Sequence, residues 1–133
     1  MIQLTVEVEG QRQLSARLRR WPSVLRKHWR RAGSKSTKTL KRIAGRYPPA
    51  PPQSTYTRTG TLGRRWDERV GDFEAVVENP TPYGPDVMGD EDQAWMHRGR
   101  WRTESQVLKA GESEIAGFYE EALENAAREL EGR

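Results

Sequence analysis

YPPAPPQSTYTRTGTLGRRW, from Tyr47 to Trp66, is the stretch that decides how this chain folds. Its first part lacks four backbone N–H donors, those of Pro48, Pro49, Pro51 and Pro52. Each proline also restricts the preceding residue to extended geometry, so a helix that comes before must end near Arg46. Residues 47–58 are therefore predicted to form a stiff extended arm of the polyproline II type.

The second part of this segment leads into a predicted β-hairpin. Gly60 gives the backbone the freedom to turn from the arm into a strand. We predict strands from Leu62 to Val70 and from Phe73 to Glu78, because Gly71-Asp72 between them suits a tight turn. Trp66 is expected to anchor the first of these strands in the core.

In front of the arm, the sequence predicts one strand followed by helices. Apolar residues from Ile2 to Val8 alternate with polar ones, which is typical of a strand with one buried face. Leu and Trp then recur at helical spacing, and Pro22 is predicted to begin a second helix, since proline is tolerated in a first turn. Residues 33–37, GSKST, are weak helix material and are expected to loosen this helix.

Behind the hairpin, residues 79–102 are rich in proline and glycine, which predicts one long loop with a short edge strand at 83–88. The apolar spacing then predicts a helix that begins at Thr103 or Ser113 and ends at Glu131. The expected fold class is α+β, with a small antiparallel sheet of the N-terminal strand and the hairpin, packed with basic N-terminal helices and a C-terminal helix. A length of 133 residues suits a single domain, 1–133.

Charge is strongly segregated along the chain. Residues 11–46 contain thirteen Lys and Arg and no acidic residue, whereas residues 103–133 contain eight Glu and only three cations. The hydrophobic fraction is only 34%, although five Trp add bulk to it. We therefore expect some apolar surface to be completed by partner subunits.

Several function classes find no support in the sequence. The chain has no cysteine, which excludes disulfides and thiolate metal sites. Its two histidines, His28 and His97, lie in no spacing typical of a metal site or a catalytic triad, and we expect His28 to be an ordinary helix-face histidine. We predict no enzymatic activity, no cofactor and no metal. No signal-like or membrane-spanning stretch is present, so a cytosolic location at synthesis is expected.

The basic stretch admits three interpretations: a phosphate-binding surface for nucleic acid, a docking surface for an acidic protein such as the Glu-rich tail of a neighbouring copy, or a solvated helix face. The candidate contact residues are Arg19, Arg20, Arg26, Lys27, Arg30 and Arg31. Trp21 and Trp29 lie among them, but their spacing predicts core positions rather than platforms for base stacking.

The predicted long loop combines large apolar groups with polar ones, the mixture that is enriched at protein interfaces. An equally weighted interpretation is that these side chains fold back as a lid over the core. The residues concerned are Asn79, Tyr83, Met88, Gly89, Trp95, His97 and Trp101.

The order of these motifs resembles a known family. An Arg-Thr-Gly-x-Leu element follows the proline-rich stretch, and its residues are Arg58, Thr59, Gly60 and Leu62. The Trp66 strand, the hairpin, Asn79, Tyr83, Val87-Met88-Gly89 and His97 come next, in that order. This arrangement is similar to that of the small tail-completion or head-tail joining proteins of long-tailed bacteriophages and prophages, and the resemblance covers most of the chain.

The resemblance implies a non-enzymatic structural protein of the virion that is assembled in the host cytoplasm. It would form a ring, expected to contain six copies, between the portal or head-closure proteins and the tail terminator or tail tube. The arm, including Tyr56, and the aromatic loop would contact neighbouring subunits. The basic helices would face either protein or the DNA that passes through the neck.

Overall fold

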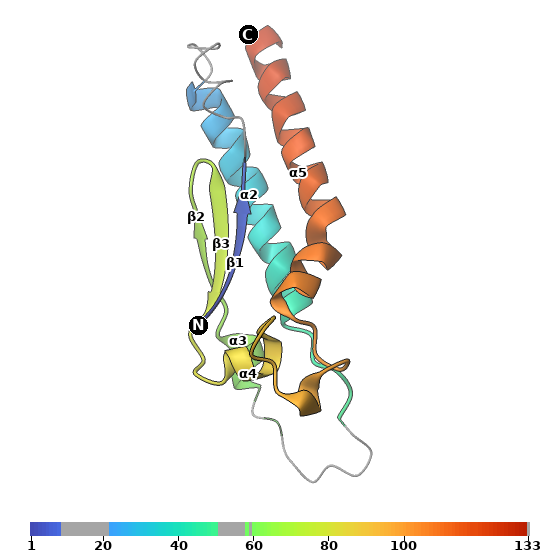
Figure 1. Ribbon diagram of the computed structural model, residues 1–133. Helices are drawn as coiled ribbons and strands as arrows, with labels where there is room; N and C mark the ends of the chain where they lie inside the picture. The colour runs from blue at the N-terminus through green and yellow to red at the C-terminus, as the bar shows by residue number, and fades with distance from the viewer. Residues whose placement is uncertain (9–21, 51–57, 59, 133) are drawn as a thin grey trace.

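The computed structural model describes residues 1–8, 22–50, 58 and 60–132, and it has an α+β fold, as predicted (Figure 1). The elements are β1 (Ile2–Glu7), α2 (Pro22–Ala44), α3 (Thr61–Arg64), β2 (Asp67–Val70), β3 (Glu74–Asn79), α4 (Gly84–Met88), the 3-10 helix η1 (Trp95–His97) and α5 (Glu104–Gly132). Predicted features at residues 9–21, 51–57 and 59 lie outside the described residues, among them Arg19, Arg20, Trp21, Pro51, Pro52, Tyr56 and Thr59.

The sheet has three antiparallel strands in the order β1-β3-β2, so the N-terminal strand and the hairpin form it as predicted. Leu4 of β1 lies opposite Val77 of β3, and both side chains are fully buried. The other face of the sheet is largely polar. There Gln3 and Arg69 donate hydrogen bonds of 2.7 and 3.1 Å to Oε1 of Glu78. One face of the sheet therefore packs on the helices and the other carries polar groups.

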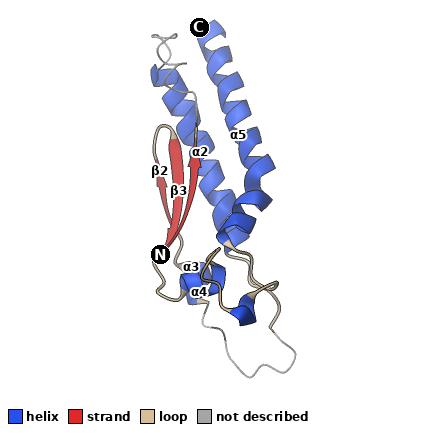
Figure 2. Ribbon diagram, viewed as in Figure 1, coloured by secondary structure: helices blue, strands red, loops and turns tan. Residues whose placement is uncertain are grey.

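Helices α2 and α5 lie side by side, and α2 packs across the buried face of the sheet (Figure 2). The predicted start of a helix at Pro22 and its end before Arg46 are confirmed. The predicted loosening at residues 33–37 is wrong, because α2 is continuous. Gly33 lets the sheet approach α2 closely, since a Cβ at this position would lie 2.9 Å from Cγ1 of Val70. Ser36 donates a 2.7 Å hydrogen bond to the carbonyl of Ala32, which a helical Ser can do.

Two buried clusters hold the helices and the sheet together. The first joins Leu4 and Val77 of the sheet to Leu40 of α2 and Val107 of α5. The second lies nearer the C-terminus of α5 and contains Leu25, Trp29, Ala32, Ala122 and Ala126. Trp29 is buried and its ring meets that of Phe73 edge-on at a centroid distance of 5.4 Å, which confirms its predicted core position.

Two predicted strand segments are helical instead. Residues Thr61–Arg64 form α3, and β2 begins only at Asp67, because one helical turn places Leu62 in the core. The expected edge strand at 83–88 is the helix α4, which Pro85 initiates; proline at the start of a helix costs no hydrogen bond. The segment 79–102 is therefore an ordered connection with two short helices rather than an irregular loop.

The C-terminal helix begins at the earlier of the two predicted positions. Thr103 and Gln106 form a capping box: the Gln106 N–H donates to Oγ1 of Thr103 at 3.3 Å, and the Thr103 N–H donates to Oε1 of Gln106 at 2.9 Å. Asp90 adds a second cap, since its carboxylate accepts hydrogen bonds from the N–H and the hydroxyl of Ser105. These contacts join the segment 79–102 to the start of α5.

Candidate functional site: the loop end

The short helices α3, α4 and η1 gather at one end of the molecule, opposite the C-terminus of α5 (Figure 1). We call this end, formed by residues 45–50, 58, 60–66 and 80–103, the loop end. It contains most of the residues that the sequence singled out. Some of these side chains are buried and form a scaffold, and the others are exposed to solvent.

The two ends of the proline-rich arm meet in a group of side chains, here called the arm base and formed by Tyr47, Arg58 and Trp101, in which the two rings meet edge-on at a centroid distance of 4.9 Å. The guanidinium carbon of Arg58 lies 5.6 Å from the centroid of the Tyr47 ring and 5.5 Å from that of Trp101. Arg58 also donates a hydrogen bond to the carbonyl of Pro48, and Arg100 donates one of 2.9 Å to that of Pro49. The arm thus leaves and rejoins the protein at a fixed point.

Asn79 fixes the turn between the arm and the sheet. Its side chain is fully buried, and Nδ2 donates a 2.7 Å hydrogen bond to the carbonyl of Leu62. Its Oδ1 accepts a 3.0 Å hydrogen bond from the N–H of Thr81. Gly60, just before α3, has φ of 76°, a backbone conformation that favours glycine. One amide side chain therefore connects α3 to the segment that follows β3.

Gln93, which the sequence interpretation missed, likewise connects separate backbone segments in the second half of the loop end through its side-chain amide. Its buried Nε2 donates hydrogen bonds to the carbonyls of Val87 at 2.8 Å and Trp101 at 3.0 Å. Gly89 is required nearby, because a Cβ there would lie only 2.6 Å from the carbonyl oxygen of Pro85. The scaffold is therefore held by side chain to backbone hydrogen bonds as well as by apolar packing.

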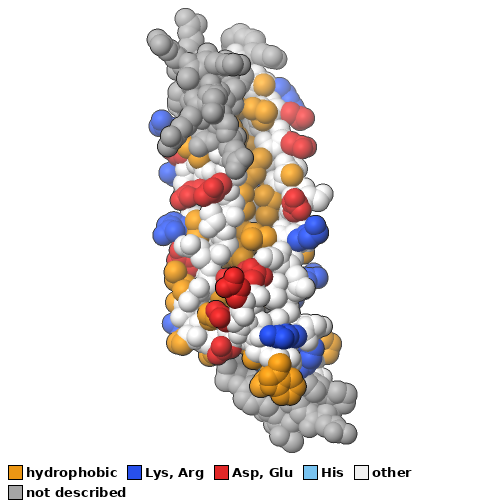
Figure 3. Space-filling view, viewed as in Figure 1, with side chains coloured by type: hydrophobic (Ala, Val, Ile, Leu, Met, Phe, Trp, Pro, Cys, Tyr) orange, Lys and Arg blue, Asp and Glu red, His pale blue; other side chains and the backbone are white. Residues whose placement is uncertain are grey.

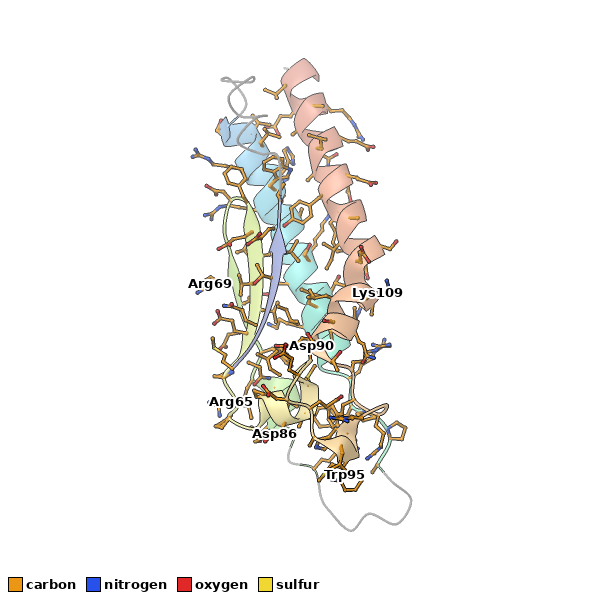
Figure 4. All side chains as sticks on the ribbon, viewed as in Figure 1. Arg65, Arg69, Asp86, Asp90, Trp95 and Lys109 are labelled. Atoms are coloured by element: carbon orange, nitrogen blue, oxygen red, sulfur yellow. The ribbon has the colours of Figure 1, made fainter. Side chains whose placement is uncertain are left out.

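Three large apolar side chains project from this scaffold. Trp95 is 79% exposed, Met96 next to it is 53% exposed, and Tyr83 is 44% exposed. Figure 4 places Trp95 at the tip of the loop end, and Figure 3 shows a large apolar group there. Such exposure of Trp on an ordered segment is typical of a contact surface rather than of a core lid.

The remaining predicted site residues of the loop end belong to its interior. Leu62, Trp66 and Met88 are buried in the main core cluster. His97 is half-buried, with its ring edge-on to Trp101 at a centroid distance of 6.2 Å. Of the seven residues predicted to form either an interface or a lid over the core, only Tyr83 and Trp95 are exposed. The interface interpretation fits these two, and the lid interpretation fits the five that are buried or half-buried.

The described cations of the predicted basic surface mostly have acidic partners within the chain. Arg26 and Arg30 lie 3.5 and 2.7 Å from carboxylate oxygens of Asp72 in the hairpin turn. Lys27 forms an ion pair with Glu129 of α5. Arg31 is exposed and forms no ion pair with another described residue. One of the three interpretations of the basic stretch placed the acidic partner on another protein, such as the Glu-rich tail of a neighbouring copy, whereas Lys27 pairs with the chain's own α5.

Further ion pairs join α2 to the acidic helix. Lys35 and Arg42 reach Glu121 and Glu114 at 3.8 and 2.8 Å. His28 is buried rather than solvated, and its Nε2 lies 2.6 Å from a carboxylate oxygen of Glu129. Hydrogen bonds from Lys27 and His28 hold the pKa of Glu129 below its ordinary value. One column of glutamates on α5 is thus used to hold the two long helices together.

Two carboxyl groups where the loop end meets α5 have shifted pKa values. The side-chain hydrogen bond from Ser105 lowers the pKa of Asp90. Burial raises the pKa of Glu104, and the nearby charge of Asp90 adds to this effect. The cap on α5 accounts for the shift of Asp90, and burial beside this cap accounts for the shift of Glu104.

The residues that the structure describes contain no group of three His, Asp or Glu placed to hold a metal ion. Among them, too, no helix combines the length and the apolar character that crossing a membrane requires. Comparison with models of known protein families, with curated proteins and with solved structures finds no match for this chain.

Proposed function

We propose that this chain is a non-enzymatic structural protein of a bacteriophage neck that joins the head to the tail as a ring-forming tail-completion protein. It would act in the virion after assembly in the host cytoplasm. Its partners would be further copies of itself, expected to number six in the ring, together with the head-closure or portal proteins and the tail terminator or tail tube.

The observation that carries the proposal is the exposure of Trp95 and Met96 on a rigid scaffold. Large apolar side chains that are exposed next to one another form the kind of patch that marks an interaction site. The scaffold beneath it is held by the buried side chains of Asn79 and Gln93, so the surface is presented in one conformation. Preorganised aromatic anchors of this kind dominate the binding free energy of protein interfaces.

The arm base provides a second support. Arg58 lies over the rings of both Tyr47 and Trp101 and closes the arm onto the body, so the segment between Pro49 and Arg58 is anchored at both ends. A segment anchored at both ends loses less conformational entropy when it binds a neighbour than a free tail does. This suits an arm that grips an adjacent subunit.

The alternative function is a nucleic-acid-binding module that uses the basic helices. It is less well supported, because Arg26, Lys27 and Arg30 already face carboxylates of the same chain, which lowers the positive potential available to phosphates. Binding to duplex DNA that falls steeply with added salt, and that reversal of these charges abolishes, would favour the alternative. Absence of binding at physiological salt would eliminate it.

The proposal is tested by complementation in a phage that lacks this gene. A variant that lacks Pro48 to Pro52, and a second variant with Trp95→Ala and Met96→Ala, should fold but yield few infectious particles. Lys38→Ala serves as a matched surface control, since Lys38 is exposed on α2. Normal titres from both variants would count strongly against the proposed role.

A further inference from the structure

Only five large hydrophobic side chains among the described residues are exposed, and they divide into two groups. Met1, Tyr83, Trp95 and Met96 lie at the loop end or beside it, and the fifth, Leu123, lies on α5 and is 45% exposed. Glu120, its neighbour three residues earlier on the same side of the helix, is also exposed, as is Glu124, the next residue in the chain. The described residues therefore present an apolar surface at the loop end and a second, smaller one at Leu123.

These two surfaces do not meet within one copy. Helix α5 begins at the loop end and runs away from it (Figure 1). Leu123 lies nineteen residues beyond Glu104, which at a rise of 1.5 Å per residue corresponds to roughly 28 Å. A contact between the two surfaces must therefore join different copies. Because it would pair two different surfaces, it is a head-to-tail contact, which generates a ring where the rotation closes.

The surroundings of Leu123 form one stripe of α5. Glu112, Ala116, Glu120 and Leu123 are separated by four, four and three residues, a spacing that places them on the same side of a helix, and all four are exposed. Glu112 and Glu120 form no ion pair with any described residue, in contrast to the glutamates that bind α2. We call these four residues the α5 stripe.

The charges beside Trp95 complement this stripe. Arg98 and Arg102 follow η1, are exposed, and form no ion pair with a described residue. Figure 3 shows basic side chains next to the apolar group at the loop end and acidic side chains along the upper part of α5. The loop end also contains Glu91 and Asp92, and Lys109 is exposed on α5, so opposite charges are available in both directions across such a contact.

We propose that the loop end of one copy docks on the α5 stripe of a second copy, with Trp95 and Met96 against Leu123 and with Arg98 and Arg102 facing Glu112 and Glu120. This inference rests on the proposed ring-forming function and names the two surfaces that make the ring. Apolar anchors supply the affinity, and the opposite charges select the partner surface and disfavour contacts between two loop ends.

The absence of cysteine from the chain allows a direct test by disulfide cross-linking. A variant with both Met96→Cys and Leu123→Cys should give, on mild oxidation at high protein concentration, a ladder of covalent oligomers that ends at a closed ring. Mixing the two single variants should give mainly a heterodimer. A double variant without a ladder, at concentrations where native mass spectrometry detects oligomers, would overturn the docking proposal and leave the ring-forming function intact.

Charge reversal provides the second part of the test. Arg98→Glu with Arg102→Glu, or Glu112→Arg with Glu120→Arg, should each lower the ladder yield by at least about tenfold, because like charges then meet. Mixing the two charge-reversed proteins should restore the ladder, since each loop end again meets an opposite charge on its neighbour. Failure of the mixture to restore it would overturn the pairing of surfaces.

The matched control reverses Arg31 and Lys38, two exposed cations of α2 that form no ion pair with a described residue. It changes the net charge as much as the loop-end variant does and should leave the ladder unchanged. A chain that is monomeric and gives no ladder at any concentration overturns the docking proposal. The complementation assay then decides the proposed function separately.

Discussion

Replacing Asn79 with alanine tests whether one buried amide holds the loop end together. The substitution leaves the carbonyl of Leu62 and the N–H of Thr81 without their partners in a buried site. Each such group costs about 1–3 kcal/mol. The free energy of unfolding should therefore fall by roughly 2–6 kcal/mol, a large share of the 5–15 kcal/mol typical of a domain.

Urea unfolding followed by tryptophan fluorescence measures this loss, with an unchanged dependence on urea as the sign that the fold is retained. Asn125→Ala on α5 is the control and should change stability by less than about 0.7 kcal/mol. A loss below about 0.5 kcal/mol for Asn79→Ala would refute the reasoning, because ordinary surface substitutions fall within that range.

Asn79→Asp separates the two hydrogen bonds. It keeps an acceptor for the N–H of Thr81 but replaces the donor to the carbonyl of Leu62 with a second oxygen. Burial should raise the pKa of the introduced carboxyl above its unfolded value of about 4. The free energy of unfolding then falls as the pH rises from the pKa of this carboxyl in the unfolded state to its pKa in the folded state. It is recovered in acid, where the protonated carboxyl can donate a hydrogen bond to the carbonyl of Leu62. A pH-independent loss would contradict this explanation.

Four further predictions concern other parts of the molecule. Gly117→Ala should stabilise the protein by about 1 kcal/mol, because a Cβ there meets nothing within 4 Å. Gly33→Ala should instead be destabilising in the same unfolding assay, since overpacking against Val70 costs about 1–3 kcal/mol and outweighs the gain in helix propensity. Asp90→Ala should lower stability at pH 7 by about 0.5–1 kcal/mol. Because the folded-state pKa of this carboxyl is lowered, that difference should shrink as the pH falls below about 4, and a constant difference would exclude the charged cap. Arg58→Lys should keep the charge but lose the planar stacking. Hydrogen exchange of the Gly63 amide, whose N–H donates a 2.9 Å hydrogen bond to the hydroxyl of Tyr47, should then become faster, and unchanged exchange would argue against the arm base.

The sequence predicted the elements that follow a regular period. The alternation from Ile2 to Val8 gave the strand β1, and apolar spacing gave both long helices. Proline chemistry located the start of α2 at Pro22 and its end before Arg46. These features depend on residues close together in the chain, so local rules were sufficient.

The errors arose where contacts distant in sequence decide the outcome. Thr61–Arg64 is helical because Nδ2 of Asn79, seventeen residues later, donates a hydrogen bond to the carbonyl of Leu62 and because the Leu62 side chain is buried in the core. Gln93 has no local signal that marks it as a scaffold residue. Two local signals in the sequence were also overlooked. The Thr103 and Gln106 pair of the capping box marks the start of α5, and Pro85 marks the first turn of α4.

The charge pattern was visible in the sequence, but its partners were not. Segregation of thirteen cations from eight glutamates indicated attraction between two segments. Whether this attraction acts within a copy or between copies depends on the packing of α2 against α5, which brings Lys27 to Glu129 across more than a hundred residues of chain. One column of α5 glutamates forms ion pairs with α2, whereas Glu112 and Glu120 are exposed and form no ion pair with another described residue.

Electron microscopy of particles assembled with the Trp95→Ala and Met96→Ala variant tests the central claim most directly. If the exposed surface of the loop end joins head and tail, the preparation should contain DNA-filled heads and complete tails that are not attached to one another. Joined particles in normal proportion, from a variant protein shown to be folded and present, would contradict the account.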